Sequence, residues 1–114
     1  MRLRQAVNGI ALSWESELTV RIHFLAMIIV SLIAYFLEVS LFEWIILFSL
    51  FGLILGLELM NTALEALCDF VHPEDHPAIK RTKDLAAGSV LIASAFAVAI
   101  AIVLFVPKIW TLFN

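Results

Sequence analysis

Three long apolar runs constrain the fold of this chain more strongly than any other feature. They cover Phe24–Leu37, Trp44–Leu57 and Leu85–Pro107. Of the 114 residues, 63% are hydrophobic and 15% are charged, whereas soluble domains have about 45–50% apolar and about 25% charged residues. A chain this short cannot enclose so much apolar surface in its own core, so lipid must cover most of it. The sequence therefore predicts an all-α membrane protein with a single domain over residues 1–114.

The lengths of the runs predict three transmembrane helices. Only the third run reaches the roughly 20 residues that cross a bilayer unaided. The other two become long enough if neighbouring helices shelter the polar residues at their ends. We expect spans at about 20–39, 41–64 and 85–107, a tight turn at 38–43, and a second helix that continues to about residue 71. Two prolines and several charges predict a loop over 72–84.

The N-terminal segment has the pattern of a helix that lies on the membrane surface. Its apolar residues recur at helical spacing, at Leu3, Val7, Ile10, Ala11 and Trp14, and polar residues separate them. A helix over about 2–16 would bury this apolar face in the headgroup region and place Trp14 at the interface. No segment resembles a cleavable signal peptide.

The distribution of basic residues predicts the orientation. Arginines and lysines occur before the first span and around the 72–84 segment, at Arg2, Arg4, Arg21, Lys80, Arg81 and Lys83. The first turn has Glu38 and Glu43 and no basic residue. The positive-inside rule therefore places the N-terminus and the 72–84 loop in the cytoplasm and the C-terminus outside. The net charge of −3 argues against a nucleic-acid partner, and a single cysteine excludes an internal disulfide.

A polar stripe at the end of the second run indicates the chemistry. In the string ELMNTALEALCDF, one helix face carries Glu58, Asn61, Glu65 and Asp69. Ionisable groups at the mouth of a span need a partner, a cation or a water-filled cavity. The topology places Glu17 and Arg21, together with Lys83 and Asp84, at the same depth.

These residue types suit phosphoryl transfer. Carboxylates on separate helices can hold Mg²⁺, and Lys83 can meet a phosphate as a point charge. Glu58 can accept a proton from an attacking alcohol if apolar surroundings favour its protonation. The chain has neither a phosphate-binding P-loop nor a glycine-rich kinase loop, so metal ions and cationic side chains would have to hold a nucleotide.

Other interpretations of the same residues remain open. The stripe could cap a helix end, or it could line the pathway of a non-catalytic cation-conducting or assembly subunit. A pore would present polar residues along the full depth of a span, and here they stop at Glu58, which weighs against conduction. The spacing of Cys68, His72 and His76 suggests zinc, but the prolines break the helix that this geometry needs. We expect His23 to form interfacial hydrogen bonds rather than to bind a metal, and the Gly52–Gly56 motif to support helix packing weakly.

The strings ELMNTALEALCDF and IKRTKDLAAGSVLIAS closely resemble signatures of the small bacterial integral-membrane diacylglycerol kinase and undecaprenol kinase family. The resemblance runs from about residue 3 to 108 and includes Ala6, Gly9, and Glu17 followed by Arg21 and His23. It implies a homotrimer in the bacterial inner membrane, with active sites shared between subunits. It also implies ATP as co-substrate, Mg²⁺ as cofactor and a lipid alcohol as acceptor.

The resemblance also implies roles for individual residues. Glu17 and Glu65 resemble the metal-binding carboxylates, and Glu58 resembles the proposed base. The ATP and phosphate contacts would come from Asn61, Lys83, Asp84, Glu17 and Arg21, and the acceptor contacts from Glu58, Arg4 and Ala6. Val20 and Leu3 stand where the family favours aromatic residues. The string HPAIKRTKDLAAGSVL and the Glu43–Trp44 pair look more like the undecaprenol kinase branch, but they leave the acceptor open.

Overall fold

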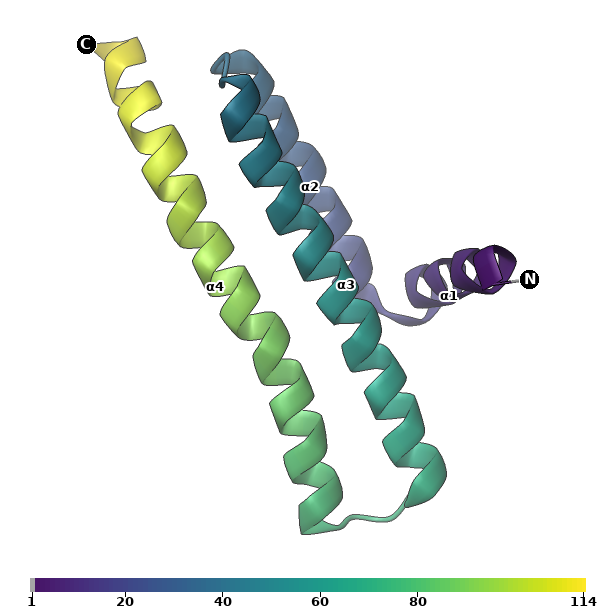
Figure 1. Cartoon of the computed structure of the whole chain (residues 1–114). Coiled ribbons are helices and arrows are strands. Elements are labelled where there is room, and N and C mark those ends of the chain that lie inside the picture. The colour runs from purple at the N-terminus through teal and green to yellow at the C-terminus, as the bar shows by residue number, and fades with distance from the viewer. Residues whose placement is uncertain (1) are drawn as a thin grey trace.

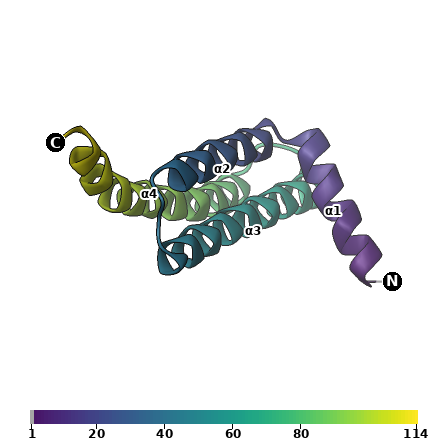
Figure 2. The same cartoon turned by 90° about the horizontal axis from the view of Figure 1, so that it is seen from above.

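The computed structural model describes residues 2–114 as an all-α chain (Figure 1). Its helices are α1 (Arg2–Ser16), α2 (Leu18–Phe36), α3 (Leu41–Val71) and α4 (Pro77–Phe113). The helices α2, α3 and α4 lie side by side, and α1 leaves them at a steep angle (Figures 1 and 2). The predicted fold class, a surface helix followed by three long apolar helices, is confirmed.

The three long helices have the properties of transmembrane spans. The most apolar windows of α2, α3 and α4 have mean hydropathies of 2.0, 2.0 and 2.8. Within the chain, only 11%, 17% and 11% of these windows are buried, so lipid or further copies of the chain must cover the rest. The chain is therefore a multi-pass membrane protein.

A capping box fixes the turn between α2 and α3. The Ser40 hydroxyl accepts a hydrogen bond from the Glu43 amide at 3.1 Å, and the Glu43 carboxylate accepts one from the Ser40 amide at 2.9 Å. Glu38 has a φ of 55°, which reverses the chain direction within a few residues. The predicted tight turn is present but lies slightly earlier than 38–43, since α2 ends at Phe36 and not at residue 39, whereas the predicted start of the second span at residue 41 is confirmed.

We expect the Ser40→Ala variant to lower the free energy of unfolding by about 1 kcal/mol, because the Glu43 amide loses its acceptor. The measurement is the unfolding midpoint in mixed SDS and maltoside micelles. The control is Ser49→Ala on the same helix, since the Ser49 hydroxyl donates only to the Ile45 carbonyl. Equal midpoints for the two variants would contradict a stabilising role for the box.

The segment between α3 and α4 is shorter than predicted. Pro77 occupies the first turn of α4, where its missing N–H costs nothing, and the His76 ring accepts a hydrogen bond from the Ala78 amide at 3.0 Å. The prediction of a loop over 72–84 is therefore wrong from Pro77 onward. Residues 77–84, including Lys80, Arg81 and Lys83, are helical.

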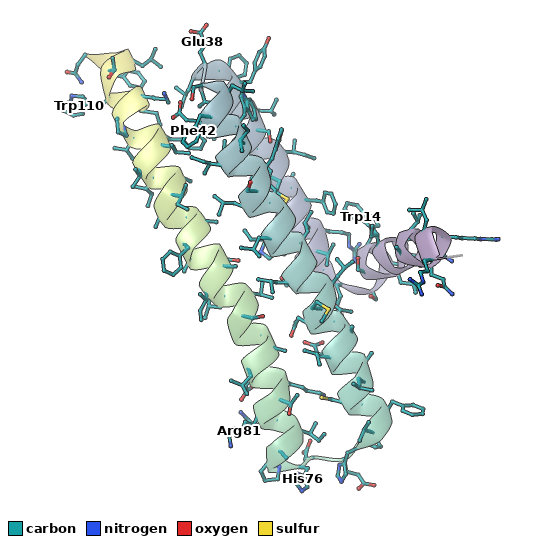
Figure 3. All side chains as sticks on the ribbon, viewed as in Figure 1. Trp14, Glu38, Phe42, His76, Arg81 and Trp110 are labelled. Atoms are coloured by element: carbon teal, nitrogen blue, oxygen red, sulfur yellow. The ribbon has the colours of Figure 1, made fainter. Side chains whose placement is uncertain are left out.

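The main apolar cluster lies at the end of the bundle opposite the loop between α3 and α4. It consists of Ala34, Val39, Leu47 and Phe105. Beside it, the Lys108 ammonium lies 3.2 Å from the Glu43 carboxylate. The helix α4 continues through Pro107 and changes direction toward its C-terminal end (Figure 2). Glu38, Phe42 and Trp110 lie at this end, whereas His76 and Arg81 lie at the other (Figure 3).

The surface helix α1 contacts the bundle partway along α3. The rings of Trp14 and Phe24 meet edge to face, with 5.3 Å between their centroids. The hairpin of α3 and α4 continues well past the level of α1 (Figure 1). From Glu58 to Val71, α3 rises by about 20 Å.

A Cβ atom added at Gly52 or Gly56 would meet nothing within 4 Å, so the Gly52–Gly56 motif forms no close helix contact within the chain.

Candidate active site

Glu58 is the centre of the candidate site. Among residues 2–114 it is the only charged residue that is buried, with 4% of its surface exposed. Its two carboxylate oxygens contact different residues of α2: His23 Nδ1 lies 3.2 Å from Oε1, and Thr19 Oγ1 donates to Oε2 at 3.4 Å. The predicted stripe therefore turns its first carboxylate inward, toward α2.

Asn61 and Glu65 form a second part of the stripe, about one and two helical turns further along α3. The Asn61 amide nitrogen donates to the Glu65 carboxylate at 3.2 Å. The Asn61 amide oxygen is buried and has no hydrogen-bond partner within the described residues. A carboxylate beside an unpaired amide oxygen is a set of hard oxygen donors, which is the chemistry that Mg²⁺ requires. The residues present therefore fit the magnesium ion that the family resemblance implies.

Two lysines near the start of α4 are paired with carboxylates. Lys83 Nζ lies 2.6 Å from Asp69 on α3, and Lys80 Nζ lies 2.6 Å from Asp84 one turn along α4. The hydrogen bond that Lys83 donates to the Asp69 carboxylate raises the pKa of Lys83, and the one that Lys80 donates to Asp84 raises the pKa of Lys80. Both lysines precede the expected span and stay cationic at neutral pH. Lys83 and Asp84 are adjacent in sequence, but Lys83 pairs with Asp69 and Asp84 pairs with Lys80.

Two shallow hollows occupy this end of α4. One has a volume of about 660 Å³ and is lined by Lys80, Arg81 and Asp84, with Gly88 and Ser89 further along the helix. The other has a volume of about 670 Å³ and extends over the 72–76 loop to Lys83. In that loop the His72 ring contacts the Glu74 carbonyl at 3.0 Å, and the His76 ring caps α4. The two hollows leave open space beside Lys80, Lys83 and Asp84 at this end of the hairpin.

The N-terminal residues of the predicted site are not joined to the stripe within one chain. Glu17 lies between α1 and α2 as the N-cap of α2, and its side chain makes no cap hydrogen bond. Arg21 is exposed on α2, and Arg4 and Ala6 are exposed on α1. Over residues 2–114, no three histidine, cysteine, aspartate or glutamate residues are close enough to hold a metal. A site shared by Glu17 and Glu65 would need two copies of the chain, and it stays a prediction.

Thr19 and His23 are contacts of the site that the sequence did not single out as site residues. They lie four residues apart on α2 and so share one face of that helix. The prediction that His23 serves as a polar partner at the interface is consistent with its contact to Glu58. Two polar residues four positions apart on one helix, followed by a glutamate within the next apolar helix, form the pattern that could have identified Thr19 and His23.

Comparison with known proteins places the chain in a family. Residues 4–105 match the sequence model of the prokaryotic diacylglycerol kinase family. The chain is 36% identical to an undecaprenol kinase of Bacillus subtilis over 99 residues, which are 84% of this chain and 80% of the relative. It is 29% identical to the diacylglycerol kinase of Escherichia coli K12 over 107 residues, or 94% of this chain and 84% of the relative. The chain therefore belongs to the prokaryotic diacylglycerol kinase family.

Membership decides between the two functions that the sequence left open. The relatives are named as kinases that act on lipids, which identifies this chain as an enzyme, a lipid kinase. The expectation of a non-catalytic subunit is set aside on this ground.

Proposed function

We propose that this lipid kinase transfers the γ-phosphoryl group of ATP to the hydroxyl of a membrane lipid, with Mg²⁺, at the cytoplasmic face of the bacterial inner membrane. The observation that carries the proposal is the buried carboxylate of Glu58, which lies on the same helix face as the oxygen donors Asn61 and Glu65. A base, a metal-binding group and a phosphate cradle are the parts that phosphoryl transfer requires.

In the proposed reaction the acceptor hydroxyl oxygen forms a bond to the γ-phosphorus of ATP. The bond between that phosphorus and the bridging oxygen of the β-phosphate breaks, and ADP leaves with the electron pair. Glu58 accepts the proton of the hydroxyl, which makes the oxygen a better nucleophile.

Residues on both sides of the hairpin would hold the nucleotide. Glu65 and Asn61 would bind Mg²⁺ with Glu17 of an adjacent copy, in a homotrimer with shared active sites. Mg²⁺, when bound, offsets the negative charge that spreads over the phosphoryl oxygens. Lys83 would exchange its contact with Asp69 for a phosphate oxygen, and Asp84 and Arg21 would complete the contacts to ATP. Arg4 and Ala6 on α1 would face the acceptor lipid.

The direction of the chain across the membrane supports the cytoplasmic placement. The 72–76 loop lies at one end of the bundle, α1 leaves the bundle partway along α3, and Lys80, Arg81 and Lys83 follow the loop in the chain. Lys108 lies alone at the opposite end, beside Glu43. The positive-inside rule assigns the lysine-rich and arginine-rich end to the cytoplasm, where ATP is available.

We expect purified protein in detergent to transfer label from [γ-³²P]ATP to a lipid alcohol. Undecaprenol and diacylglycerol should be assayed side by side, and the higher identity to the Bacillus relative favours undecaprenol as the better acceptor. Chelation of Mg²⁺ by EDTA should abolish transfer, and excess Mg²⁺ should restore it. Absence of label on both lipids would contradict the proposed function, and equal rates would contradict the preference.

A further inference from the structure

Glu58 obtains both of its polar contacts from α2 and none from its own helix. A carboxylate that is 4% exposed needs partners, because its desolvation is costly. On α3, the Thr62 hydroxyl donates to the backbone carbonyl of Glu58 rather than to the carboxylate, and Asn61 donates to Glu65. The contacts to Thr19 and His23 therefore account for all the polar partners of this carboxylate within the described residues.

The two contacts together favour one orientation of the carboxylate plane. The last torsion of a glutamate side chain, next to the planar carboxyl group, has broad minima, so the rotamer alone does not set which oxygen faces which way. Here Oε1 contacts His23 at 3.2 Å and Oε2 contacts Thr19 at 3.4 Å. Two partners on one face of α2, each holding a different oxygen, restrict rotation about that bond.

Neither contact is an ideal hydrogen bond. The contact to Thr19 is long, and the Nδ1 atom of His23 is buried without an aligned hydrogen-bond partner. His23 also lines an apolar cavity of about 220 Å³ between α2, α3 and α4. Looser contacts that tighten when substrate arrives are common around catalytic groups.

We propose that Thr19 and His23 are positioning residues, which hold the Glu58 carboxylate in the orientation that receives the proton of the acceptor. The inference rests on the proposed function, in which Glu58 is the base. It assigns to α2 a part in the chemistry that is separate from the phosphate contact expected of Arg21.

The test compares variants that remove a contact with variants that retain it. Thr19→Val and His23→Leu preserve most of the side-chain volume but remove the polar atom that contacts the carboxylate. Thr19→Ser retains the hydroxyl, and His23→Asn places an N–H near the position of Nδ1. Ser31→Ala, further along α2, is the control for handling in detergent. The unfolding midpoint is measured for every variant, and Thr19→Ala or His23→Ala replaces a contact-removing variant that does not fold.

We expect Thr19→Val and His23→Leu each to lower kcat about tenfold, with KM for ATP and for the lipid nearly unchanged, because a small misplacement of a catalytic group slows chemistry without weakening binding. Thr19→Ser and His23→Asn should recover most of the loss. Unchanged kcat in the contact-removing variants would overturn the inference. A loss that the retaining variants do not recover, or a rise in KM alone, would also overturn it, because either would indicate a packing or binding role.

The wild-type protein and Glu58→Gln are assayed in the same series. If the wild type phosphorylates lipid and Glu58→Gln does not, a normal kcat in the α2 variants refutes only the positioning role. If the wild type is inactive, or Glu58→Gln is fully active, the proposed function itself fails.

Discussion

Replacing Glu58 by glutamine is expected to lower kcat by at least about 10²-fold, the lower range of the contribution of a general base. Glutamine preserves the shape of the side chain and can still accept from Thr19, so the packing of α2 against α3 should survive. Only the capacity to take up the acceptor's proton is lost. The measurement is steady-state transfer of labelled phosphoryl to the lipid, with the unfolding midpoint as the check on folding.

The matched control for this variant is Glu15→Gln. Glu15 is exposed on α1, and the substitution makes the same chemical change without touching the site. It should leave kcat within about twofold of the wild type, as expected for an exposed residue without a role. A Glu58→Gln enzyme that turns over as fast as Glu15→Gln would refute the assignment of Glu58 as the base.

Replacing Glu65 by glutamine should abolish turnover while the oligomer stays intact. Charge stabilisation by a bound metal ion is worth several kcal/mol in the transition state, and each 1.36 kcal/mol is a factor of ten in rate. We therefore expect a loss of about 10²-fold or more at saturating Mg·ATP. The variant can still accept the hydrogen bond from Asn61, so the helix face itself is preserved.

The Glu65→Gln prediction is checked by titrating Mg²⁺ at fixed ATP and by size-exclusion chromatography of the same samples. Glu74→Gln, in the exposed loop between α3 and α4, is the control. A near-normal rate for Glu65→Gln at saturating Mg·ATP would contradict its role as a metal ligand. A change in oligomeric state would instead point to a structural role for Glu65.

The sequence predicted the fold well where periodicity and helix signals agreed. The start of α3 at Leu41 and its end at Val71 follow from a long apolar run that continues into the polar stripe. The prediction of a loop at Pro77 is wrong, because the fixed φ and missing N–H of this proline suit the first turn of a helix. A single sequence does not distinguish a proline that lies in a loop from one that occupies the first turn of a helix.

The site was predicted in part. The stripe on α3 identified Glu58 because spacing alone places residues on one helix face. The contacts of Glu58 with Thr19 and His23 depend on how α2 is rotated against α3, which packing decides and a single sequence does not reveal. The pairing of Lys83 with Asp69 across the hairpin was missed for the same reason, since those residues are 14 positions apart and meet only after the loop closes.

The connection between α1 and α2 has a mechanical consequence. Glu17 alone separates the two helices, so the backbone torsions of this one residue set the angle at which α1 leaves α2. Hydrophobic mismatch changes the tilt of helices that cross a bilayer. A change in the tilt of α2 relative to α1 would have to be absorbed at Glu17, which is also a residue expected to bind the metal of a shared site.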